Sequence, residues 1–211
     1  MDAESPPAGT AVFLGIDIGT SKCAAVCTDT DRRVLAVSSR VHEADLPARP
    51  GRHEQSADVL LQTARDVVGD LPEAVLARVQ GVGLTGQMHG VLLLDSRMRA
   101  VSPLITWKDQ RCLEGDFLPR LSGRTERPNL RTGYGGATLA WMMARDSLPT
   151  EVVAAATVHD FVCARLAGLE RPVTDPTDAS GWGFFDMDAW EWDFDAVAAP
   201  AYAEAELVVA C

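Results

Sequence analysis

The chain opens with a two-residue alternation of apolar and other positions. Between positions 12 and 18 one set faces a core while Asp17 points from the other face, and that apolar set is Val12, Leu14, Ile16 and Ile18. Small and polar residues from 19 to 22 form a turn, and a second strand returns over 23–27. The pattern predicts a β-hairpin with Asp17 at a strand end, facing a cleft.

Four more elements follow before position 100. Residues 33–41 extend the antiparallel set by a third strand. Over 54–69 apolar residues recur at spacings of three and four, which predicts an amphipathic helix ending near Gly69. Residues 79–85 are a short buried strand, and 91–95 are another apolar strand after a turn. The order predicts an α/β fold with a mixed sheet that opens with an antiparallel hairpin and is flanked by helices.

The segment 103–111 has two interpretations. If it is extended throughout, Trp107, Asp109 and Arg111 share one face, where an indole stacks on a sugar and the charged groups bind hydroxyls. The alternative is a buried tryptophan beside a structural Asp–Arg ion pair, which composition alone favours. The sequence leaves both open.

Three later segments also carry polar groups beside apolar runs. Residues 133–143 are a glycine-rich turn and an apolar helix, which suits either a substrate-facing loop or packing. Residues 157–168 predict a helix capped by His159 or Asp160 and ended by Gly168, with those two residues as caps rather than catalysts. A polar turn and aromatics follow over 175–186. The alanine-rich residues 196–211 lack the turn and cap signals that usually end a domain.

Composition narrows the class of protein. The 211 residues are 47% hydrophobic and 23% charged, which is typical of a globular chain with one large core, and we expect disorder only at the ends, including residues 1–10. The net charge of −11 argues against nucleic-acid binding. No secretory signal and no apolar run of about 18 residues is seen, so no membrane partner is expected.

The five cysteines form no C-x-x-C pair, which indicates reduced thiols and a cytoplasmic protein. Cys23 and Cys27 fall on one strand face, where small apolar packing is the expected role.

The hairpin tip suits phosphate chemistry. A carboxylate beside backbone amides, hydroxyls and a lysine matches a nucleotide phosphate with its magnesium, and the residues concerned are Asp17, Gly19, Thr20, Ser21 and Lys22. An ordinary hairpin turn is the alternative.

Four separated motifs bear on this choice. They are GIDIGTSK at 15–22, GLTGQMHG at 83–90, ITWKDQR at 105–111 and TDPTDAS at 174–180. In this order they resemble the amino-terminal domain of the FGGY family of carbohydrate kinases over roughly residues 10–195. The resemblance implies an actin-like ATPase (ribonuclease H-like) domain over 11–195. The segments at 131–141, 157–162 and 179–186 look most like the members that transfer the γ-phosphate of ATP to sedoheptulose.

The resemblance also implies roles for single residues. Asp17, with Gly19, Thr20, Ser21 and Lys22, is implied to face the ATP phosphates, and Asp17 to hold Mg²⁺ through water. The residues implied to border the sugar are Gln87, Met88, His89, Trp107 and Asp109. Relatives that bind glycerol carry an Arg–Glu pair in place of Met88–His89, so a ketose is favoured over glycerol.

One departure limits the implied activity. The family's catalytic base and adenosine motifs lie in a second domain that is expected beyond the end of this chain, so no catalytic residue is expected here and the chain alone is expected to be inactive. The partners implied are ATP and a ketose. Kinases of xylulose or ribulose, and a non-catalytic sugar-binding protein, are the alternatives.

Overall fold

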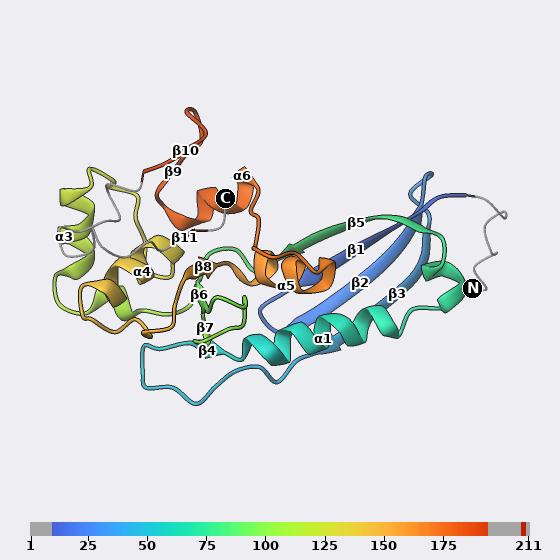
Figure 1. Cartoon of the computed structure of the whole chain (residues 1–211), viewed down its shortest axis with the longest axis horizontal. Helices are drawn as coiled ribbons and strands as arrows, with labels where there is room; N and C mark the ends of the chain where they lie inside the picture. The colour runs from blue at the N-terminus through green and yellow to red at the C-terminus, as the bar shows by residue number, and fades with distance from the viewer. Residues whose placement is uncertain (1–9, 194–207, 210–211) are drawn as a thin grey trace. The chain divides into compact units, whose positions relative to one another are not determined.

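The computed structural model describes residues 10–193 and the backbone of 208–209 (Figure 1). The expectations for residues 1–9 and for most of 196–211 therefore lie outside the described residues. The chain forms two compact units, each described here by itself. The first unit is 10–44 with 58–87, and the second is 45–57 with 88–193 and 208–209.

The first unit is built on a four-stranded sheet in the order β3-β2-β1-β5. β1 (Val12–Ile18), β2 (Lys22–Asp29) and β3 (Val34–Val41) are antiparallel, and β5 (Val79–Gly86) runs parallel to β1. This confirms the mixed sheet that opens with a hairpin. The prediction that residues 79–85 are buried was wrong, because β5 lies at an edge of this sheet and Val82 is 60% exposed.

The apolar alternation of the hairpin is confirmed. Val12, Leu14, Ile16 and Ile18 are buried, as are Cys23 and Cys27 on the paired strand. α1 (Ala57–Gly69) runs along the sheet beside β3 (Figure 1), and Arg40 of β3 binds Asp66 and Asp70 near the carboxyl end of α1. The buried side chains of α1 are Ala57, Leu60, Leu61, Ala64 and Val67. A short helix, α2 (Glu73–Leu76), leads into β5.

The helix begins at Ala57 and not at Glu54. Glu54 and Gln55 form strand β4 (Glu54–Gln55), which pairs with β7 (Leu104–Ile105) in the second unit. Gln55 is fully buried, and its side chain donates to the Asp45 carboxylate at 2.7 Å. Long-range pairing therefore replaced the first turn that the periodicity predicted.

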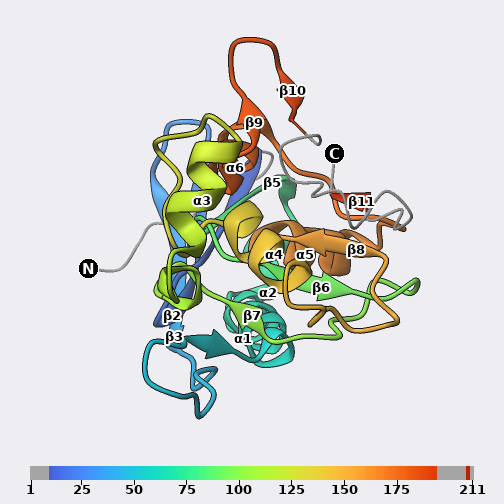
Figure 2. The same ribbon diagram turned by 90° about the vertical axis from the view of Figure 1, so that its left-hand side faces the viewer.

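The second unit contains three small sheets and several short helices. β6 (Leu92–Leu94) lies beside β8 (Ala154–Ala156), which also pairs with β11 (Val208–Val209) (Figure 2). β9 (Phe185–Asp186) pairs with β10 (Glu191–Trp192). The helices are η1 (Arg111–Leu113), α3 (Phe117–Arg124), α4 (Gly135–Met143), α5 (Val158–Ala167), α6 (Pro176–Ala179) and η2 (Ser180–Trp182).

Helix α4 is the centre of this unit. Every residue from Gly135 to Met143 is buried, which confirms the apolar helix and explains why it has no polar face. Trp182 and Phe184 belong to the same core cluster. No described helix is both long enough and apolar enough to span a bilayer.

Helix α5 ends as predicted but begins differently. Gly168 adopts the left-handed conformation that terminates the helix. The cap, however, is Thr157, whose Oγ1 accepts from the Asp160 amide at 3.3 Å. The prediction of His159 or Asp160 as the cap was wrong, because both side chains turn inward to a buried carboxylate described below.

Two glycine-to-alanine changes should have opposite effects on stability. A Cβ on Gly136 of α4 would lie 2.7 Å from the Trp182 carbonyl oxygen and would overlap the Phe184 ring, so Gly136→Ala should destabilise the fold by about 1–3 kcal/mol despite alanine's better helix propensity. A Cβ on Gly123 of α3 would meet nothing within 4 Å, so Gly123→Ala should gain up to about 1 kcal/mol. Urea unfolding of the two variants beside the wild type measures both. Equal effects would show that α4 has room for a side chain.

Candidate functional site

The tip of the hairpin in the first unit is a tight turn that is open to solvent. Asp17, the last residue but one of β1, is exposed and pairs with Ala24 and Thr85 on the neighbouring strands. The Gly19 amide donates to the Lys22 carbonyl at 3.0 Å, and a Cβ on Gly19 would lie 2.9 Å from that oxygen. Glycine is therefore required for the turn that carries Thr20, Ser21 and Lys22.

A histidine that the sequence patterns did not single out supports this turn. Nε2 of the buried His42 lies 3.1 Å from the Gly19 carbonyl oxygen, and the His42 amide donates to the Ser21 carbonyl at 3.2 Å. The Ala44 amide donates to Nδ1, so the proton of the ring sits on Nε2 and is donated to Gly19. No local signal marks His42, because its partners lie about one hairpin earlier in the chain.

Gln87 reaches the same tip from the end of β5. Its amide donates to the Ile18 carbonyl at 2.8 Å, and Thr20 Oγ1 donates to Gln87 Oε1 at 3.5 Å. The structure thus brings together Thr20 and Gln87, which are 67 residues apart in sequence.

Beside Asp17 the sheet face is hollowed. Small side chains line a recess of about 400 Å³, and its walls include Gly15, Asp17, Ala24, Val26, Gly83 and Thr85. Its surface is almost wholly apolar, so a ligand in this recess would meet mainly carbon atoms.

In the second unit, His89 is held in a defined orientation. Its backbone has φ 64° and Gly90 follows with φ 74°, so the chain reverses sharply at this point. His89 Nδ1 lies 2.7 Å from the Gly181 carbonyl oxygen, and the ring stacks on Tyr134 with centroids 4.4 Å apart and planes 15° apart. Tyr134 was not predicted as a site residue, and the glycine-rich turn around it was equally compatible with a substrate-facing loop and with packing.

Trp107, Asp109 and Arg111 do not share one face, so the first interpretation of the segment 103–111 was wrong. The alternative was right about the ion pair but wrong about a buried tryptophan. Trp107 is 45% exposed, whereas Asp109 is fully buried and Arg111 nearly so. The chain turns after Thr106, whose carbonyl accepts from the Asp109 amide at 3.1 Å, and then enters η1. Strand geometry ends at Ile105, so alternate residues no longer share a side.

Asp109 and Arg111 form the ion pair of the alternative interpretation. The Asp109 carboxylate accepts from Arg111 Nε at 2.8 Å, from Arg111 Nη2 at 2.9 Å and from the His53 amide at 2.9 Å. Burial by itself would raise the pKa of Asp109, but these hydrogen bonds and the charge of Arg111 hold it below its usual value. Arg111 also pairs with Glu54 at 2.6 Å. Both carboxylate oxygens of Asp109 are thus used within the protein.

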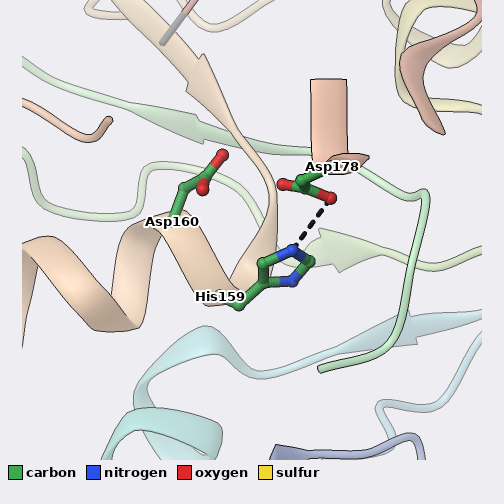
Figure 3. Close-up of side chains that lie close together, drawn as sticks. All are labelled: His159, Asp160 and Asp178. Atoms are coloured by element: carbon green, nitrogen blue, oxygen red, sulfur yellow. Dashed lines mark ion pairs between the residues drawn. The ribbon is translucent and has the colours of Figure 1, made fainter. Parts of the chain in front are cut away.

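A second buried cluster joins α5 to α6 (Figure 3). His159, Asp160 and Asp178 offer ligand atoms within 4.8 Å of one another, and Asp178 Oδ1 lies 2.8 Å from His159 Nε2. Asp178 Oδ2 accepts from Thr157 Oγ1 at 2.7 Å and from Thr174 Oγ1 at 3.3 Å. Asp178 thus binds three protein groups and is the centre of a buried ion pair with hydrogen bonds.

The cluster shifts the proton affinities of its members. Burial, and then the negative charge of Asp178, raises the pKa of Asp160 to about 7. For Asp178, burial acts upward, but the hydrogen bond and charge of His159 outweigh it and the pKa is lowered. For His159, burial acts downward, but the hydrogen bond and charge of Asp178 outweigh it and the pKa is raised.

Asp160 should make stability depend on pH. A pKa raised from 3.8 to about 7 means that the folded state holds this proton more tightly than the unfolded chain, so the stabilisation is present below pH 3.8 and lost as pH rises through about 7. Asp160→Asn lacks this titration. Its stability relative to the wild type should therefore increase between pH 4 and pH 7 by on the order of 1–3 kcal/mol. Thermal unfolding over this range measures the difference, and the exposed Asp188→Asn is the control; parallel curves for Asp160→Asn and wild type would contradict the assignment.

Comparisons with known proteins give the same family as the four sequence motifs. The model of the FGGY family of carbohydrate kinases, N-terminal domain, matches residues 12–208. The sedoheptulokinases of Mus musculus and Homo sapiens are each 32% identical to 88% of this chain, and the xylulose kinase of Haemophilus influenzae is 30% identical to 86% of it. The chain spans only 44% of the sedoheptulokinases and 39% of that xylulose kinase.

Solved structures of carbohydrate kinases also resemble this chain. The xylulose kinase of Rhodospirillum rubrum superposes with a TM-score of 0.78 at 26% identity, covering 95% of this chain and 43% of that one. The gluconate kinase of Lactobacillus acidophilus gives a TM-score of 0.79 at 18% identity, over 96% of this chain and 42% of that one. The predicted actin-like ATPase fold is confirmed by this likeness. The chain therefore belongs to the FGGY family of carbohydrate kinases.

Proposed function

We propose that the protein carrying this chain is an ATP-dependent ketose kinase and that its substrate is sedoheptulose, converted to sedoheptulose 7-phosphate. The observation that carries the proposal is the exposed Asp17 beside the hairpin turn that Gly19 and His42 hold in place. The 32% identity to two sedoheptulokinases supports the choice of sugar. A reaction in the pentose phosphate pathway follows from that choice.

In this proposal the hairpin tip binds the ATP phosphates. Backbone amides and hydroxyls of Thr20 and Ser21 donate to phosphate oxygens, and Lys22 adds a positive charge. Gly19, whose amide donates to the Lys22 carbonyl, shapes the turn that places these groups beside the phosphates. The donor set fits magnesium, since the exposed Asp17 carboxylate is an oxygen ligand of the kind that Mg²⁺ accepts, directly or through water. Bound Mg²⁺ would supply charge neutralisation on the phosphates.

The sugar is proposed to contact groups that present polar atoms or an aromatic face. In the second unit Met88 and His89 come shortly after β5, and the half-exposed Trp107 offers its indole to the C–H face of a sugar. Tyr134, stacked on His89, joins this set. Gln87, which is 7% exposed and accepts from Thr20 Oγ1, is proposed to act indirectly from the hairpin unit. Asp109, which has no exposed surface, is proposed to act indirectly by holding Arg111 and the His53 backbone.

The proposed compartment is the cytoplasm. Cys23, Cys27, Cys112 and Cys163 are free thiols, which suits a reducing environment. Burial and then the charge of Asp17 raise the pKa of Cys23 to about 11, and burial has the main part in raising that of Cys112 to about 11 as well. These two thiols are therefore unreactive packing groups.

A kinase of xylulose is the second candidate, because the xylulose kinase of Haemophilus influenzae is 30% identical. A panel of five-, six- and seven-carbon ketoses, assayed by coupled ADP release, separates the two. The assay should use both the 211-residue chain and the longest gene product that contains it. Preference for a five-carbon ketose would replace sedoheptulose by xylulose or ribulose, and sugar binding without turnover in either protein would favour a non-catalytic role.

Asp17→Asn tests the phosphate site. Loss of the charge that faces magnesium should lower turnover at saturating ATP by at least about a hundredfold, with little change in sugar affinity. Asp31→Asn, an exposed aspartate at the β2–β3 turn, is the matched control. Near-normal turnover of Asp17→Asn at saturating magnesium would refute the assignment.

His89→Ala and Trp107→Ala test the sugar site. Each substitution removes one proposed contact. The fall in kcat/KM for the ketose should correspond to a loss of about 1–3 kcal/mol of transition-state stabilisation, while KM for ATP changes less. Trp190→Ala, a 67% exposed tryptophan, is the control for loss of an indole. Unchanged ketose kinetics in both variants, with folding verified by circular dichroism, would show that His89 and Trp107 serve packing and do not contact the sugar.

A further inference from the structure

The contact between His89 and Gly181 identifies the proton on the His89 ring. Nδ1 lies 2.7 Å from the Gly181 carbonyl oxygen, and a carbonyl oxygen can only accept. Nδ1 must therefore carry the proton. In the neutral ring, Nε2 then has a free lone pair and acts as a hydrogen-bond acceptor.

The orientation of the ring is fixed by two further features. Tyr134 stacks on it at 4.4 Å and sets its plane. The ring also leaves no room beside Gly181, because a Cβ at that position would lie 3.0 Å from His89 Nδ1 and 3.6 Å from Cε1. The position of the Gly181 backbone thus decides where Nε2 points.

Gly181 in turn belongs to a short, hydrogen-bonded helical segment. α6 passes directly into η2, with Ser180 Oγ donating to the Thr177 carbonyl at 2.7 Å and the Gly183 amide donating to the Ser180 carbonyl at 3.3 Å. Trp182 of the same segment is buried in the core around α4. A displacement of α6 would therefore displace the Gly181 carbonyl.

Asp178 ties this segment to α5. It is 3% exposed and lies three residues before Gly181 in the same helical stretch. Its carboxylate accepts from Thr157 Oγ1, the cap of α5, and pairs with His159 Nε2. These bonds join two segments about 20 residues apart at a buried point (Figure 3).

We propose that Asp178 is a positioning residue for His89. By binding Thr157 and His159 it holds α6 and η2 so that the Gly181 carbonyl accepts the Nδ1 proton of His89, and Nε2 is presented as an acceptor. The group that such an acceptor recognises is a hydroxyl, which donates to it. The identity of that hydroxyl as a ketose hydroxyl rests on the proposed function; the tautomer and its control by Asp178 do not.

The tautomer can be measured in the 211-residue chain itself. Long-range ¹H–¹⁵N spectra, recorded with the imidazole in its neutral form, distinguish a protonated from an unprotonated ring nitrogen, and His89→Gln identifies the His89 signals among the four histidines. The expected wild-type spectrum has the proton of His89 on Nδ1 and an unprotonated Nε2. A proton on Nε2 overturns the proposal.

Five variants test how the tautomer is held. Gly181→Ala pushes on the ring directly and should abolish the single Nδ1–H form, whereas Gly123→Ala, in open space, should leave the spectrum unchanged. Asp178→Ala should have the same effect at a distance, and Asp178→Asn, which can still accept from Thr157, should retain part of the signal. Asp175→Asn, which keeps the cap of α6, is the matched control. If Asp178→Ala does not fold, Asp178→Asn decides, and a wild-type His89 spectrum in that variant overturns the role of Asp178.

Kinetics give a second readout that a purely structural residue would not produce. In the active gene product Asp178→Asn should raise KM for the ketose at least about tenfold with a much smaller change in KM for ATP. Equal losses toward both substrates would overturn the proposal. If no ketose is phosphorylated even by the wild type while the tautomer depends on Asp178 as stated, the proposed function fails and the positioning of His89 stands.

Discussion

The second unit depends on the close approach of backbone segments at glycines. A Cβ on Gly135 would lie 2.7 Å from the Gly90 carbonyl oxygen, one on Gly136 would lie 2.7 Å from the Trp182 carbonyl oxygen, and one on Gly133 would overlap the Trp107 backbone. Because none of these positions carries a side chain, the start of α4 touches three segments that are distant in sequence. Those segments bring His89, Trp107 and Gly181 to the same helix end. Larger residues would move them apart, since protein interiors leave no spare volume.

Buried charges contribute a second constraint. Within this unit Arg111 forms ion pairs with Asp109 and Glu54, and His159 forms one with Asp178. The carboxylates of Asp109 and Asp178 also accept hydrogen bonds from backbone or hydroxyl groups. Desolvation offsets much of the attraction in such pairs, so their contribution to net stability is modest. Their directional bonds instead fix the positions of the turn after Thr106 and of the short helix before Gly181. Loss of one partner would leave the other charge buried and unpaired.

The two units offer different chemistry to a ligand. The hairpin unit presents a carboxylate, hydroxyls and amides around a glycine turn that His42 supports from behind. The second unit presents an imidazole stacked on a phenol and a half-exposed indole. The proposed function assigns phosphates to the first set and a polyol to the second.

Local periodicity determined a large part of the fold. The alternation at 12–18 gave β1 and its buried face, the spacing of Leu60, Leu61 and Ala64 gave α1, and the apolar run at 135–143 gave α4. These predictions succeeded because burial of one face of a strand or helix imposes a hydrophobic period that is visible within the segment itself. The motif around Asp17 was also evident, since a tight turn needs glycine and small residues wherever it occurs.

Tertiary contacts decided what periodicity could not. The pairing of Glu54–Gln55 with Leu104–Ile105 shortened α1, and the turn after Thr106 buried Asp109 while Trp107 stayed partly exposed. His42, Tyr134 and Asp178 joined the candidate site through partners roughly 20 to 50 residues away. A side chain's hydrogen-bond partners depend on which backbones approach one another in space. The sequence by itself therefore determined the main strands and helices and the glycine turn of the hairpin, and only the tertiary structure decided which polar side chains are buried supports and which stay exposed.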